Sequence, residues 1–141
     1  MKRSSLNFKN NLRGSAVLSF IHGKEMILKN EVKDFLSKEF VSEGFDETVV
    51  FEANETDSLL SAIQNNLGGG LFGSQLIIKV IHSEGRFPKS LSEVLEKIDL
   101  GNMSNIKIII DSISESISSN TKWIKKNKEL IQIIECKKLK P

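Results

Sequence analysis

Short runs of β-branched and other apolar residues alternate along this chain with segments of helical period. Such alternation is typical of β-α-β units, because two parallel strands need a crossover between them. We therefore predict an α/β fold with one five-stranded parallel sheet and helices on both faces. The predicted strands are residues 15–21, 48–52, 75–81, 105–111 and 130–136.

The predicted helices are residues 25–40, 56–67, 88–98 and a short segment around Trp123 and Ile124. In the first of them apolar residues recur at three- and four-residue spacing, which predicts an amphipathic helix packed on the sheet. Its lysines are expected to lie largely on other sides of the helix. They are Lys24, Lys29, Lys33 and Lys38.

The size and charge of the chain narrow its function class. Its 141 residues suit one domain, and 20 basic against 18 acidic residues give a net charge of only +2. Seven lysines lie between Lys122 and Lys140; without interleaved aromatics or arginines, we interpret them as a solvated face and tail rather than a DNA-contacting patch. The single cysteine, Cys136, excludes an internal disulfide, and no apolar run approaches the roughly 20 residues of a membrane span. We expect a cytoplasmic protein with no membrane partner.

The turn after the first predicted strand lies where a phosphate-binding loop would be expected. Gly23 and Lys24 lead from strand to helix, and backbone N–H groups at a helix N-terminus attract anions. The phosphate-loop motif also requires a glycine five residues before Gly23, where Leu18 stands, and a hydroxyl residue after the lysine, where Glu25 stands. Leu18 and Glu25 argue against nucleotide binding here.

Other sequence matches to known sites are weak. Gly68, Gly70 and Gly73 spell G-x-G-x-x-G, but this match follows a helix and opens a strand, the reverse of the dinucleotide fingerprint. Asp111 ends a predicted strand, and we interpret it as a turn residue rather than a magnesium ligand.

Two histidines, His22 and His82, follow the carboxyl ends of predicted strands, where the active sites of α/β proteins gather. We interpret both as surface or hydrogen-bonded residues, because the spacing supplies no nucleophile, paired carboxylate or metal-ligand set. We accordingly expect no catalytic residue, no cofactor and no metal site.

Two large apolar residues, Leu71 and Phe72, stand among glycines between the second predicted helix and the third predicted strand. Loops run over protein surfaces, and an exposed Leu-Phe pair is typical of an anchor for the apolar pocket of a protein partner. The alternative is that both side chains fold under the sheet as part of the core. The residues alone leave both interpretations open.

The order of several short motifs resembles the N-terminal domain of the delta subunit of the bacterial DNA polymerase III clamp loader. The resemblance covers nearly the whole chain. It rests on residues 18–25 (LSFIHGKE), 43–46 (EGFD), 71–80 (LFGSQLIIKV) and 134–139 (IECKKL).

The resemblance implies a P-loop NTPase or AAA+-like core that lacks a functional phosphate loop. In the family a Leu-Phe pair before the third strand inserts in a hydrophobic pocket of the ring-shaped sliding clamp, and Leu71 and Phe72 occupy the matching positions. The implied function of residues 1–141 is to bind and help open that clamp in DNA replication, as a non-catalytic part of a nucleotidyltransferase complex.

The delta family continues into a lid domain and a collar domain, which we expect to be absent from this chain. Contacts with other clamp-loader subunits are therefore expected of the full-length protein, and DNA contact is expected only through the assembled complex. The alternative function is a degenerate nucleotide-binding α/β domain with residual NTPase activity.

Overall fold

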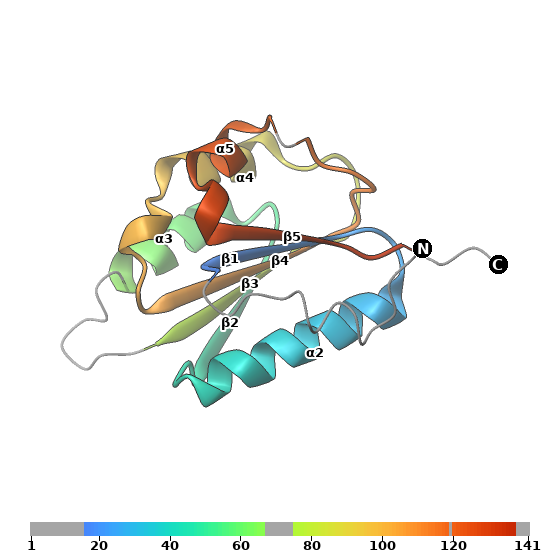
Figure 1. Cartoon of the computed structure of the whole chain (residues 1–141). Helices are drawn as coiled ribbons and strands as arrows, with labels where there is room; N and C mark the ends of the chain where they lie inside the picture. Colours follow the sequence, from blue (N-terminus) through green and yellow to red (C-terminus); the bar gives the residue numbers. More distant parts are fainter. Residues whose placement is uncertain (1–15, 67–74, 119, 138–141) are drawn as a thin grey trace.

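A computed structural model describes residues 16–66, 75–118 and 120–137, in which strands and helices alternate as predicted (Figure 1). The strands are β1 (Leu18–His22), β2 (Glu47–Glu52), β3 (Leu76–His82), β4 (Ile106–Ser112) and β5 (Ile131–Glu135). The α-helices are α2 (Met26–Ser42), α3 (Thr56–Asn66), α4 (Lys89–Lys97) and α5 (Lys122–Lys126), and the short 3-10 helices are η2 (Leu100–Asn102) and η3 (Lys128–Leu130). None of the helices in these ranges is both long and apolar enough to cross a lipid bilayer.

The five strands form one sheet in the order β2-β3-β4-β1-β5, and every neighbouring pair is parallel. Helix α2 covers one face of the sheet, whereas α3, α4 and α5 cover the other (Figure 1). This arrangement confirms the predicted sheet with helices on both faces. The chain leaves β1 toward one face and leaves the adjacent strand β4 toward the other. Open α/β sheets bind their ligands beside such a pair of strand ends.

The sheet separates two hydrophobic cores. The larger core lies beneath α3, α4 and α5 and includes Phe20 and Trp123, whose ring centroids are 5.7 Å apart. The smaller core lies beneath α2, where Val32 and Leu36 belong to the same cluster as Ile109 of β4. All 7 residues of β4 are buried, as is typical of a central strand in a parallel sheet.

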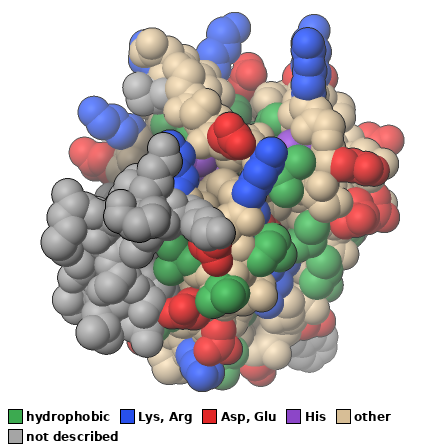
Figure 2. Space-filling model, turned by 90° about the vertical axis from the view of Figure 1, so that its right-hand side faces the viewer, with side chains coloured by type: hydrophobic (Ala, Val, Ile, Leu, Met, Phe, Trp, Pro, Cys, Tyr) green, Lys and Arg blue, Asp and Glu red, His purple; other side chains and the backbone are tan. Residues whose placement is uncertain are grey.

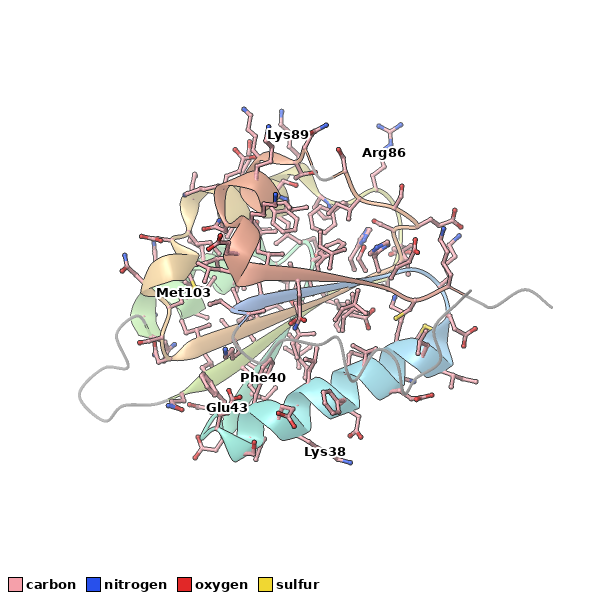
Figure 3. The ribbon with its side chains drawn as sticks, in the orientation of Figure 1. Lys38, Phe40, Glu43, Arg86, Lys89 and Met103 are labelled. Carbon is pink, nitrogen blue, oxygen red and sulfur yellow. The ribbon has the colours of Figure 1, made fainter. Side chains whose placement is uncertain are left out.

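Helix α2 places one charged residue on its buried face. The buried residues are Lys29, Val32, Leu36 and Phe40, which recur at helical spacing. Figure 3 shows Phe40 between α2 and the sheet and Lys38 directed away from both. The predicted outward position is confirmed for Lys38, whose side chain is 77% exposed, but is wrong for Lys29, whose side chain is 1% exposed.

Three of the strands end one residue later than predicted, at His22, His82 and Ser112. Parallel pairing sets these ends, because His22 and His82 both pair with Ser112 in register. The first strand begins at Leu18 rather than at residue 15. Strand limits depend on the neighbouring strands, which a local sequence window does not contain.

Candidate functional site

The carboxyl ends of β1 and β4 form the switch point of the sheet, which we define by Gly23, Asp111 and Ser112. A ligand of an open parallel sheet binds at this position. The turn at Gly23, where a phosphate loop was considered and rejected, and Asp111, which was rejected as a magnesium ligand, both lie here. In this protein the ammonium of Lys29, from α2, lies between the two strand ends and contacts all three residues.

The ammonium of Lys29 uses its full hydrogen-bonding capacity at the switch point. Its Nζ lies 2.7 Å from Oδ1 of Asp111. It also donates to the backbone carbonyls of Gly23, at 2.8 Å, and of Ser112, at 2.9 Å. A lysine ammonium has three donors and no acceptor, and a buried charge is tolerated when it is paired and hydrogen-bonded. These contacts explain how a fully buried lysine is accommodated on the apolar face of α2.

Asp111 is neutralised by two lysines of the same helix. Lys29 contacts its Oδ1, and Nζ of Lys33 lies 2.6 Å from its Oδ2. Burial would raise the pKa of Asp111, but the hydrogen bonds and charges of Lys29 and Lys33 outweigh burial and lower that pKa below its ordinary value. The interpretation of Asp111 as a turn residue is wrong, because it lies within β4 and forms a buried ion pair.

The turn after β1 is closed by the chain that follows β5. The backbone N–H of Cys136 donates to His22 O at 2.8 Å, and the N–H of Glu25 donates to Cys136 O at 3.2 Å. Gly23 has a φ of 113°, and a Cβ at that position would lie 2.2 Å from Cys136 O. The carboxylate of Glu25 accepts a hydrogen bond from the N–H of Ile27 at 3.2 Å. The backbone donors of Glu25 and Ile27, which a phosphate loop would direct at an anion, are thus used within the chain.

Both histidines are buried and hydrogen-bonded, in agreement with the hydrogen-bonded role predicted for them. His82 Nε2 lies 3.0 Å from Gly85 O, and its Nδ1 lies 2.8 Å from Ser112 Oγ. Because a carbonyl oxygen only accepts, Nε2 of His82 bears a proton, and Nδ1 of the same ring is hydrogen-bonded to the Ser112 hydroxyl. His22 donates from Nδ1 to Ser114 O at 3.3 Å.

A serine hydrogen-bonded to a histidine is the geometry of an activated nucleophile. Ser112, however, is 0% exposed and His82 is 3% exposed, so the hydroxyl of Ser112 is out of reach of a substrate. Figure 2 looks at the molecule from the right-hand side of Figure 1 and shows the histidines only as small purple areas. The geometry of this pair supports a structural role.

The predicted anchor residues, Leu71 and Phe72, lie outside the described residues. The two ends of their segment are described and meet at Asn105, which is buried. The side-chain amide of Asn105 donates to the carbonyl of Asn66, the last residue of α3. The backbone carbonyl of Asn105 accepts a hydrogen bond from the N–H of Leu76, the first residue of β3, at 2.9 Å. The segment between α3 and β3 therefore starts and ends at fixed positions, at the amino ends of the strands.

Lys29 and Lys33 are the site residues that sequence reasoning missed. A signal for Lys29 was present, because it precedes Val32 by three residues and therefore shares the buried stripe of α2. Lys33 lies one turn after Lys29 and reaches Asp111 from a position that remains 21% exposed. The sequence holds no comparable signal for the contact between Lys33 and Asp111, since these two residues are 78 positions apart.

The sequence matches no protein-family model and no curated protein. Solved structures do share the fold. The Bacillus subtilis DNA clamp loader delta protein matches over 94% of this chain and 40% of its own length, with a TM-score of 0.57 and 16% identity. C. elegans PCH-2 matches over 92% of this chain and 37% of its own length, with a TM-score of 0.55 and 14% identity. Saccharomyces cerevisiae RIF2 matches over 96% of this chain and 55% of its own length, with a TM-score of 0.51 and 20% identity. This chain thus spans between about a third and a little over half of each solved chain. At these identities the likeness establishes the fold alone, which is an AAA+-like α/β fold.

Proposed function

We propose that this chain is a clamp-loader delta-type domain that binds a DNA sliding clamp and helps to open it. The observation that carries the proposal is the fold shared with the Bacillus subtilis DNA clamp loader delta protein over 94% of the chain. The short motifs that resemble the delta family occur along this fold in the family's order. The shared fold and the shared order of motifs both support the proposal.

In this proposal the anchor is the pair Leu71 and Phe72, inserted in an apolar pocket of the clamp. An aromatic and an aliphatic side chain buried together supply a small hydrophobic hot spot. Asn105 holds both ends of the intervening segment, through Asn66 and Leu76. Fixed ends reduce the conformational freedom that the segment loses on binding, which favours affinity.

The proposed function is binding without catalysis. The ammonium of Lys29 at the switch point and the closure of the turn at Gly23 both argue against the alternative of a degenerate nucleotide-binding domain with residual NTPase activity. Other clamp-loader subunits would be further partners. DNA would be contacted by the assembled complex, in the cytoplasm, as part of the DNA polymerase III machinery.

Direct binding of the clamp tests the proposal. The purified chain would be immobilised and exposed to a bacterial sliding clamp, and the association would be followed by surface plasmon resonance. We expect saturable binding at physiological salt, because an apolar anchor is weakly screened by ions. Absence of binding up to tens of micromolar clamp, with a chain that melts cooperatively, would refute the proposal.

A further inference from the structure

The ammonium of Lys29 is surrounded by oxygens from separate parts of the fold. They are Oδ1 of Asp111, the carbonyl of Gly23 and the carbonyl of Ser112, at 2.7, 2.8 and 2.9 Å from Nζ. We propose that the switch point of this chain can hold a monovalent cation, and that the lysine ammonium of Lys29 fills that position. The inference does not depend on clamp binding.

The three distances are hydrogen-bond lengths of an ammonium, and they are compatible with some free cations but not with others. Magnesium takes oxygen ligands at about 2.0 to 2.1 Å and calcium at about 2.3 to 2.6 Å, so both ions would need a tighter cage than the present one. In potassium channels, backbone carbonyls bind the potassium ion and replace its hydration shell. One carboxylate and two carbonyls at 2.7 to 2.9 Å therefore suit ammonium or potassium better than a divalent ion.

The oxygens are held in place by contacts other than those of Lys29. Ser112 is paired with His22 on one side and with His82 on the other. Gly23 is fixed by the closure of its turn against Cys136, where even a Cβ would not fit. We therefore expect the three oxygens to keep their positions when the side chain of Lys29 is shortened.

The carboxylate also keeps a separate neighbour. Lys33 contacts Oδ2 of Asp111, whereas Lys29 contacts Oδ1, so the loss of Lys29 leaves Oδ1 facing the vacated position. The Lys29→Ala variant should then bind a free cation of ammonium size between Asp111, Gly23 and Ser112. A cation that binds only the folded state raises the free energy of unfolding by mass action.

The test is chemical rescue of Lys29→Ala. Urea unfolding and thermal melting would be measured in the chlorides of ammonium, potassium, sodium and tetramethylammonium at equal ionic strength. We expect ammonium and potassium to raise the melting midpoint of Lys29→Ala above its value in sodium by roughly 3 to 6 °C. Tetramethylammonium, which is too large for the site, should give no rise.

Wild type and two variants serve as controls. Wild type and Lys33→Ala retain the ammonium of Lys29, so the melting midpoint of each protein should be the same in all four salts. The double variant Lys29→Ala/Asp111→Asn lacks the carboxylate and should lose the specific response. Equal midpoints of Lys29→Ala in all four salts would overturn the proposal, and so would an equal rise in wild type or in the double variant.

A refolding assay covers the case in which Lys29→Ala is unfolded in sodium. Urea-denatured variant would be diluted into each salt and its far-UV circular dichroism recorded. We expect native-like helix and sheet signals in ammonium or potassium only. Failure to refold in all four salts, or equal refolding in all four, would overturn the proposal.

Discussion

Nζ of Lys29 lies 2.7 Å from Oδ1 of Asp111, in an ion pair whose side chains are 1% and 8% exposed. The pair connects helix α2 to the central strand β4. Breaking a buried pair by removing one partner commonly costs about 3 to 5 kcal/mol, because the other charge stays buried. Much of the stability of this fold should therefore depend on the charge of Asp111.

The stability that Asp111 contributes should depend on pH in a predictable direction. Its pKa is lowered in the folded protein, so its contribution is fully present above the ordinary value of 3.8 and is lost as the pH falls through the lowered pKa. We expect Asp111→Asn to be less stable than wild type above about pH 5, and the difference to shrink on acidification. Urea unfolding of both proteins between neutral and acid pH measures it. A difference that stays constant over this range would contradict the assignment.

Gly23 should be far less tolerant of alanine than Gly85. Both glycines have positive φ, at 113° and 72°, so alanine at either costs about 1 to 2 kcal/mol of backbone strain. At Gly23 the new Cβ would also lie 2.2 Å from Cys136 O, whereas at Gly85 no described residue other than the two chain neighbours would come within 4 Å of it. We expect Gly23→Ala to be destabilised well beyond Gly85→Ala in urea unfolding. Similar losses in the two variants would show that the turn is not closed as described.

The thiol of Cys136 should react only when the protein opens. Burial is the main cause that raises its pKa to about 11, and the side chain is 0% exposed. The thiolate is the reactive form, so labelling by a thiol reagent near pH 8 should be slow in the folded chain and fast in urea. Wild type is compared with Gly23→Ala, which should label faster because its turn no longer fits against Cys136. Rapid labelling of folded wild type would contradict the burial of this residue.

The chain should not bind ATP with micromolar affinity, in the presence or absence of magnesium. Calorimetry would be carried out on wild type and on Glu25→Thr, which restores a hydroxyl residue after Lys24. We expect no saturable heat from either protein, because the ammonium of Lys29 occupies the switch point whatever residue stands at position 25. Micromolar affinity in wild type would refute the absence of a nucleotide site. Affinity in Glu25→Thr alone would show that the lost motif, rather than Lys29, prevents binding.

Much of the fold could be predicted because local patterns of apolar residues indicate the strands and the buried faces of the helices. Strand β4 contains the apolar run Ile108–Ile110 and proves to be buried throughout. The spacing of Val32, Leu36 and Phe40 likewise gave the buried face of α2. Strand ends were less predictable, since His22 and Ser112 extend their strands by pairing with each other.

The switch point could not be predicted as a whole, because its residues come from distant parts of the chain. Lys29 was expected to lie on another side of its helix than the apolar residues, and Asp111 was expected to be a turn residue at the end of a strand. Each expectation neglects the other residue, and only the packing of α2 on β4 brings the two charges together. The failed phosphate-loop motif at Gly23 was recognisable in the sequence, but the ammonium that takes its place was not.

The central claim is that Leu71 and Phe72 anchor a sliding clamp, and the most direct test is the affinity of a Leu71→Ala/Phe72→Ala variant. A matched control is Met26→Ala/Ile27→Ala, which removes two apolar side chains that are 54% and 72% exposed at the start of α2. Anchor residues typically contribute about 2 to 4 kcal/mol each, so the anchor variant should bind the clamp at least about tenfold more weakly. Its melting temperature should stay close to that of wild type, and the control should bind normally.

The measurement that decides is the dissociation constant for the clamp by surface plasmon resonance, with the melting temperature recorded on the same samples. The account predicts weakened binding and unchanged melting for the anchor variant alone. Unchanged affinity would contradict it. So would early melting, since the loss of a buried Phe costs roughly 3 to 5 kcal/mol of folding stability and would place the pair in the core.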